Sequence, residues 1–157
     1  MLFRSASSYT FSSIAASWTD LIAIMSCPGE TGSSYYGALS FQLNGDTGTN
    51  YSTTTVEGNG TSAVSQRQST QSQTWASGFQ ATGSTISYMI ISNFMNYANA
   101  STYKTILNRA SGAGMGTSSY VGLWRSTSAI TSIKFIEPYG GQFNAGTTIA
   151  LYGVKSA

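Results

Sequence analysis

Residues 35–45 read YYGALSFQLNG, and this stretch indicates the fold class most clearly. From Leu39 to Asn44 apolar and polar residues alternate, which is the period of two expected for a strand with one buried face and one wetter face. The stretch ends on Asn44-Gly45, a pair favoured in tight turns because both residues tolerate a positive φ angle. We therefore predict a β-strand that ends in a turn.

Similar short runs recur along the chain, separated by Gly, Asn and Ser, and no window has the apolar spacing of an amphipathic helix. Residues 85–94 (TISYMIISNF) are apolar on both faces, as in a central strand. Residues 65–74 (SQRQSTQSQT) are polar throughout, as in an exposed edge strand or a loop. Residues 44–64 are expected to be a loop with at most a short strand. The other predicted strands cover residues 18–26, 103–110, 120–126, 130–137 and 147–155.

Seven to eight short strands joined by turns predict an all-β fold, either an antiparallel β-sandwich or a small barrel. Strand spacing alone does not distinguish a jelly roll from an immunoglobulin-like sandwich. The length of 157 residues fits one domain, which we assign to residues 18–157. Residues 1–17 are rich in Ser and Ala and are expected to form an extended N-terminal arm.

Isolated apolar residues in this arm are the candidate partner-binding residues, because they have no local core to enter. A bound neighbour would bury them against its own surface. The alternative is that they cover the end of the sandwich to which they belong. The candidates are Leu2, Phe3, Tyr9, Phe11 and Ile14.

The composition excludes several kinds of chemistry. The chain has no histidine and a single cysteine, Cys27, so catalytic sites and metal sites that need imidazole are excluded, as is an internal disulfide framework. The longest unbroken apolar run, Leu21–Met25, is far shorter than a bilayer span. The seven basic residues are scattered, unlike the clustered charge of nucleic-acid-binding proteins. We expect no cofactor, no metal, no nucleic-acid partner and no membrane partner.

Carboxylates are also few. A glycosidase needs two facing carboxylates, and Asp46 and Glu57 are the candidate pair, but solvated surface positions explain them more simply. The segment 44–50 (NGDTGTN) has the alternating oxygen donors of a calcium loop but only one carboxylate, so we interpret it as a turn. The sequence therefore predicts a protein that is not an enzyme.

Aromatic residues near predicted loops suggest a second type of function, stacking on sugar rings. The simpler alternative is that these aromatic residues belong to the core of the sandwich or to a subunit interface. The sugar-stacking candidates are Tyr35, Tyr36, Tyr51, Tyr97 and Trp75.

Only 8% of the residues in the chain are charged. Electrostatic repulsion between copies therefore gives little protection against association, which favours a protein that works in an assembly.

Two segments, 40–51 (SFQLNGDTGTNY) and 130–155 (ITSIKFIEPYGGQFNAGTTIALYGVK), resemble the small β-sandwich structural proteins of tailed bacteriophages. These include capsid decoration (cement) proteins and related head or tail appendage proteins. The resemblance covers roughly residues 36–155. It implies a jelly-roll-like sandwich without enzyme activity, made in the host cytoplasm and placed on the capsid surface of the virion. The implied partners are the major capsid protein and copies of the chain itself, as a homotrimer.

The resemblance does not separate head from tail proteins. The alternative function is therefore a tail or head-fibre component, including a receptor-binding or glycan-binding module. On either reading the protein acts by binding its neighbours or a receptor.

Overall fold

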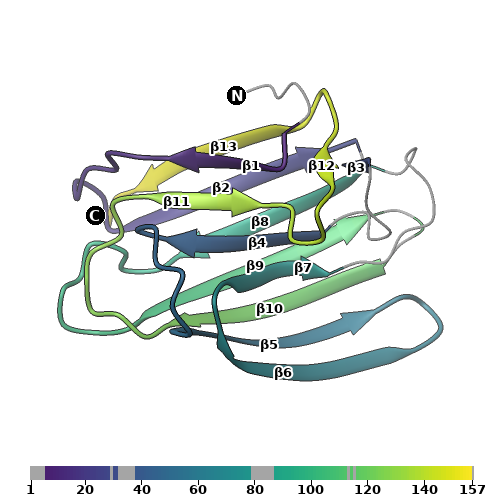
Figure 1. The fold of residues 1–157 in the computed structure, drawn as a ribbon, viewed down its shortest axis with the longest axis horizontal. Coiled ribbons are helices and arrows are strands. Elements are labelled where there is room, and N and C mark those ends of the chain that lie inside the picture. Colours follow the sequence, from purple (N-terminus) through teal and green to yellow (C-terminus); the bar gives the residue numbers. More distant parts are fainter. Residues whose placement is uncertain are drawn as a thin grey trace.

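The computed structural model describes residues 6–28, 30–31, 38–78, 87–112, 114 and 116–156. In this part of the chain the regular elements are all strands, arranged as two packed antiparallel sheets with a small two-stranded sheet at one end (Figure 1). The prediction of an all-β antiparallel sandwich is confirmed.

The larger sheet has seven strands and forms one whole layer of the sandwich. Each strand pairs with a neighbour in antiparallel register. Its order is β13 (Thr148–Val154), β2 (Asp20–Cys27), β8 (Tyr88–Phe94), β9 (Lys104–Gly112), β10 (Gly116–Trp124), β5 (Tyr51–Gly58) and β6 (Ala63–Gln71).

The smaller sheet covers only part of the larger one (Figure 1). Its edge strand β7 contacts β9 and β10, whereas the outermost strand of the larger sheet, β6, is exposed on both faces over residues 63–70. The smaller sheet has the order β1 (Ser8–Phe11), β11 (Ile133–Ile136), β4 (Ala38–Leu43) and β7 (Thr74–Gly78), and β12 (Gln142–Phe143) pairs with β3 (Glu30–Thr31).

Seven of the thirteen strands in the described residues lie where the sequence predicts a strand, and β6 lies in the stretch expected to be an edge strand or a loop. Residues 85–94 contain β8, which is central as expected, and residues 65–74 overlap β6, which is an edge strand. The loop expected over residues 44–64 is wrong in part, because β5 forms an eight-residue strand there between β10 and β6. Its threonine-rich sequence suits a strand, since β-branched side chains pack well on a pleated surface.

Part of the predicted N-terminal arm belongs to the smaller sheet. Residues 8–11 form β1 and pair with β11. Tyr9, Phe11 and Ile14 are partly buried against the core, and the Phe11 ring lies 5.7 Å from the Phe135 ring, centroid to centroid. These three side chains therefore cover the end of their own sandwich, and their role in partner binding stays a prediction. Leu2 and Phe3 lie outside the described residues.

The apolar core fills the space between β2 and β8 on one side and β4 and β11 on the other. Phe41 is fully buried and makes ring contacts with Phe94 at 5.3 Å and with Phe135 at 4.9 Å. Cys27 is buried at the end of β2. The contact between Phe41 and Phe94 holds β4 of the smaller sheet over β8 of the larger one.

The segment 44–50 is a turn that carries the chain from the smaller sheet to the larger one. Asn44 and Gly45 both have positive φ angles, 53° and 69°, as the primed turns require. The Asp46 carboxylate accepts hydrogen bonds from the N–H of Gly48 at 2.8 Å and from Nε1 of Trp124 at 2.7 Å. The turn interpretation of this segment is confirmed.

Candidate functional site

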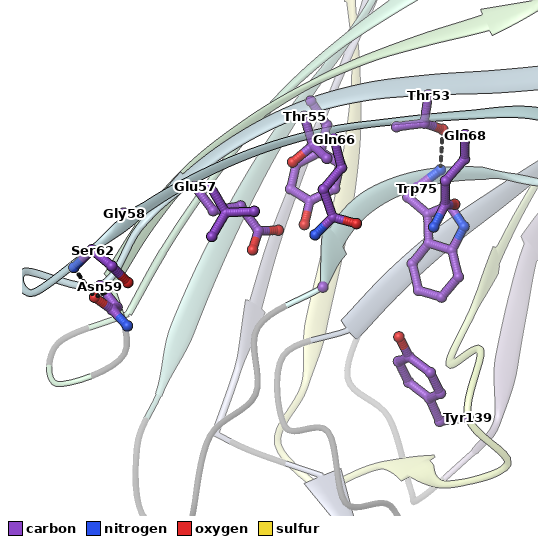
Figure 2. Close-up of a pocket in the computed structure, with 13 residues that line it drawn as sticks. Thr53, Thr55, Glu57, Gly58, Asn59, Ser62, Gln66, Gln68, Trp75 and Tyr139 are labelled. Atoms are coloured by element: carbon purple, nitrogen blue, oxygen red, sulfur yellow. Dashed lines mark hydrogen bonds between the residues drawn. The ribbon is translucent and has the colours of Figure 1, made fainter.

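A groove lies where the larger sheet extends beyond the smaller one. The β5–β6 hairpin continues past the edge strand β7, and the space between them is an open pocket with a volume of about 450 Å³ (Figure 2). One wall is the inner face of the hairpin. The opposite wall comes from β7 and from the loop that follows β11. We call this pocket the hairpin groove.

The wall formed by the hairpin is a polar surface set by strand register. Thr53 pairs with Gln68, Thr55 with Gln66, and Glu57 with Val64. Because side chains alternate across a sheet, these pairs place their side chains on the same inner face. The side chains of Glu57 and Gln66 extend into the groove in Figure 2.

Trp75 is held in the groove by hydrogen bonds to its backbone. Its N–H donates to Oγ1 of Thr53 at 3.1 Å, and its carbonyl oxygen accepts from Nδ2 of Asn108 at 3.4 Å. The hydroxyls of Thr53 and Thr74 lie 3.0 Å apart. These bonds require the two sheets to approach closely, and Gly122 permits this, since a Cβ there would lie 2.2 Å from Oγ1 of Thr74.

Tyr139 faces Trp75 from the loop after β11. The ring centroids are 5.4 Å apart and the planes are inclined at 48°. The buried carboxylate of Glu137 holds this loop, because it accepts the N–H of Tyr139 at 3.1 Å and also the N–H of Gly141. A charged acceptor that receives two backbone donors fixes a loop more strongly than a neutral one would. The two aromatic rings therefore lie side by side on the wall opposite the hairpin, and each is held there through its backbone.

The hairpin groove carries little charge. Glu57 is the only ionisable carboxylate among its lining residues, and no lysine or arginine is among them. Burial raises the pKa of Glu57 above its usual value. The groove therefore suits a ligand without a strong negative charge of its own.

The possible pairing of Asp46 with Glu57 does not occur. Trp124, which donates to Asp46, pairs with Tyr51 at one end of β5, whereas Glu57 pairs with Ser118 at the other end. Six residues of strand separate the two ends, which is about 20 Å at the usual rise per residue. Hydrogen bonds from Trp124, Asn50 and Gly48 outweigh the opposing effect of partial burial and hold the pKa of Asp46 below its usual value.

A second surface, the outer face of the larger sheet, is apolar and has no layer over it in the described structure. Leu107 and Val121 are cross-strand neighbours on this face and are 39% and 43% exposed. Arg109 is the charged residue beside them on β9, and it pairs with Ile91 and Ser119. The other apolar side chains of this outer face are Ile22, Ile24, Val56, Met89, Ile91, Leu123 and Tyr152.

The structure places the five sugar-stacking candidates in different environments. Tyr51 and Tyr97 are fully buried, so neither presents a ring to a ligand. Tyr35 and Tyr36 lie outside the described residues, and Trp75 lines the hairpin groove. The sequence analysis did not identify Tyr139 or Gln66 as site residues. Gln66 and Gln68 are two residues apart in a polar stretch, and this spacing is a signal that their side chains share one face of a strand.

Within the described ranges, no three His, Cys, Asp or Glu residues gather as a metal site. Nor does that part of the chain hold a helix long and apolar enough to cross a bilayer. No protein-family model matches the sequence, and no curated protein matches it either. The candidate binding surfaces of the protein are therefore the hairpin groove and the outer face of the larger sheet.

Proposed function

We propose that the protein is a non-enzymatic structural protein of a tailed-bacteriophage virion, of the capsid decoration type, which binds across capsid subunits and to copies of itself. The observation that carries this proposal is the outer face of the larger sheet, where Leu107, Val121 and Tyr152 are exposed together with several half-buried aliphatic side chains. Exposed apolar side chains gathered on one face in this way mark interaction sites in proteins.

The mechanism is attachment through many small contacts. A clamp that contacts several shell subunits at once gains affinity from multivalency, even when each contact is weak. A rigid sandwich loses little conformational entropy on docking. The outer face supplies apolar contacts, and the serine-rich and threonine-rich surface around it supplies direct and water-mediated hydrogen bonds. Because few charges take part, attachment depends only weakly on salt concentration.

The N-terminal residues remain part of the proposal. Leu2 and Phe3 precede β1, and the capsid contacts proposed for them do not conflict with the packing of Tyr9, Phe11 and Ile14 on the core. The outer face is the additional contact surface that the structure brings to the proposal.

Co-sedimentation with virion shells depleted of this protein tests the proposal. The double variant Leu107→Lys/Val121→Lys places two charges on the outer face and is expected to lower shell binding at least tenfold. Ala145→Lys is the matched control, because Ala145 is an exposed apolar residue in the turn before β13 and not in a strand of this face. It is expected to bind like the wild type.

Circular dichroism and thermal unfolding establish that both variants fold. A wild-type protein that fails to sediment with depleted shells contradicts the decoration role. A folded double variant that binds shells as well as the wild type contradicts the assignment of the outer face.

A further inference from the structure

We propose that the hairpin groove binds a neutral saccharide, with a sugar ring against Trp75 and Tyr139 and sugar hydroxyls on Gln66, Gln68 and Glu57. The groove and the outer face lie on opposite faces of the larger sheet. This proposal therefore goes beyond shell attachment and does not depend on it. It applies equally to a decoration protein and to a fibre component.

The first support is the shape of the groove. A volume of about 450 Å³ falls within the usual range of small-molecule sites. The groove is open to solvent on one side rather than enclosed, so it can admit one unit of a longer chain as well as a free sugar.

The second support is a pair of aromatic rings held ready for contact. Tyr139 is 41% exposed and Trp75 is partly exposed, and both rings border the same space in Figure 2. Aromatic rings offer large apolar contact area at a low cost in side-chain entropy. The Trp75 N–H donates to Oγ1 of Thr53, the Trp75 carbonyl oxygen accepts from Asn108, and the loop backbone donates to Glu137; these hydrogen bonds lower this cost further.

The third support is the set of polar groups opposite the rings. Gln66 and Gln68 are exposed and share the inner face of β6, and each side-chain amide offers donors and acceptors to a hydroxyl group. Nε1 of Trp75 is buried and has no acceptor among the described residues. An unpartnered buried donor on a residue that lines the pocket costs free energy, and a ligand oxygen that reached it would recover this cost.

The charge of the groove selects the class of saccharide. Glu57 is its only carboxylate, and its lining includes no cation to neutralise a phosphate, sulfate or sialic-acid group. A carboxylate accepts hydrogen bonds from sugar hydroxyls but repels a second negative charge. An extended peptide is the less suitable occupant, because pairing along the free edge of β6 would use backbone groups and leave Trp75 without a contact.

The test is binding of the full chain to an array of neutral di- to hexasaccharides built from glucose, galactose, mannose and N-acetylglucosamine. Sialylated and sulfated glycans and extended peptides are included for comparison. The strongest array ligand is then titrated by tryptophan fluorescence and calorimetry. We expect a neutral saccharide to bind, with affinity that changes less than twofold between 50 mM and 500 mM NaCl.

Substitutions locate the site. Trp75→Ala is expected to lower affinity at least tenfold, and Gln66→Ala/Gln68→Ala about fivefold. Trp18→Ala is the matched control, since Trp18 is an exposed tryptophan that packs on Gly153 at the far edge of the sheet. It is expected to bind like the wild type. If Trp75→Ala fails to fold, Tyr139→Ala replaces it, because Tyr139 lies in a loop.

Three results overturn the proposal: no neutral saccharide bound at millimolar concentration, binding that survives in the folded groove variants, or binding of peptides or acidic glycans alone. Shell co-sedimentation of the same groove variants separates the two proposals. The groove variants are expected to sediment with shells like the wild type, so loss of saccharide binding and loss of shell attachment are distinguishable.

Discussion

The interior of the sandwich has two halves that are held together in different ways. Between β2, β8, β4 and β11 the sheets meet through aromatic and aliphatic side chains, with Phe41 in contact with Phe94 and Phe135. Between β5, β9, β10 and β7 buried polar groups stand among the apolar side chains, including the paired hydroxyls of Thr53 and Thr74. The first half derives its stability from burial, and the second uses hydrogen bonds to position a wall of the hairpin groove.

The second half also contains buried polar atoms that the fold does not satisfy. Nε1 of Trp75, Oγ of Ser77, Oδ1 of Asn108 and Oγ of Ser118 have no partner among the described residues, and all four lie on β7, β9 or β10. Each such atom costs free energy when it is buried. The unsatisfied polar atoms therefore lie in the second half, and one of them, Nε1 of Trp75, belongs to a residue that lines the hairpin groove, where functional sites tend to carry such costs.

The largest effect is expected in the apolar half. Phe41→Ala removes a fully buried ring with two aromatic contacts, so the free energy of unfolding should fall by about 3–5 kcal/mol. Thr53→Val in the polar half replaces only the hydroxyl, with its hydrogen bonds, by a methyl group and should cost about 1–2 kcal/mol. Urea unfolding measures both. Equal losses would show that the two halves do not differ in how they are held.

The close approach of the sheets at Gly122 is the next test. Gly122→Ala places a Cβ 2.2 Å from Oγ1 of Thr74, and the resulting overpacking should cost about 2–3 kcal/mol. Removing the hydroxyl in Gly122→Ala/Thr74→Ala should recover part of this loss in the same urea experiment. A single variant as stable as the wild type would mean that the sheets separate easily in the polar half.

Tyr51 provides a buried hydroxyl that is fully satisfied, in contrast with the orphaned atoms. It donates to the carbonyl oxygen of Asp46 at 3.0 Å and accepts the N–H of Leu43 at 3.0 Å. Tyr51→Phe should therefore lower the free energy of unfolding by about 1–2 kcal/mol at pH 7.

The same variant has a distinct pH signature. Burial raises the pKa of Tyr51 to about 12, whereas an unfolded tyrosine ionises near pH 10. The stability from this group is therefore present below pH 10 and is lost as the pH rises from 10 to 12. The difference in unfolding free energy between wild type and Tyr51→Phe should shrink across that window. A difference that stays constant from pH 8 to pH 12 would contradict the burial of the hydroxyl.

The smallest effect has the opposite sign. Ser77→Ala removes a fully buried hydroxyl that has no partner in the described structure, so the free energy of unfolding should rise by about 0.5–1 kcal/mol. Ser40→Ala is the matched control, because the buried Oγ of Ser40 donates to the carbonyl oxygen of Ile136. That change should lower stability by about the same amount. A loss of stability in Ser77→Ala would show that its hydroxyl is bonded in solution.

The two halves also differ in how far sequence alone predicted them. The apolar half has clear periodic patterns, so β4 and β8 were predicted from residues 35–45 and 85–94. In the polar half the sequence also predicts β9 and β10, but the Thr53-Thr54-Thr55 run shows no contrast between its faces, so it predicts a loop with at most a short strand where β5 lies. Here β-branched propensity was the better guide than hydrophobic alternation.

The hairpin groove could not be predicted because it depends on a tertiary relation. It exists because the β5–β6 hairpin extends beyond β7, and no local sequence feature reports the relative width of two sheets. Trp75 was selected as a loop aromatic and lines the groove, whereas Tyr51 and Tyr97 were selected for the same reason and are core residues. Burial separates these three tryptophan and tyrosine residues, and burial follows only from the packed fold.

The strand order has a consequence for how the chain folds. The larger sheet pairs β2 with β13, and the smaller sheet pairs β1 with β11, so early strands complete their hydrogen bonding only with strands made about 120 residues later. Folds dominated by such distant contacts form slowly, in milliseconds to seconds. During synthesis on a ribosome, the unpaired edge of β2 stays open until β13 has emerged, and that interval is when misassociation between nascent chains is most damaging.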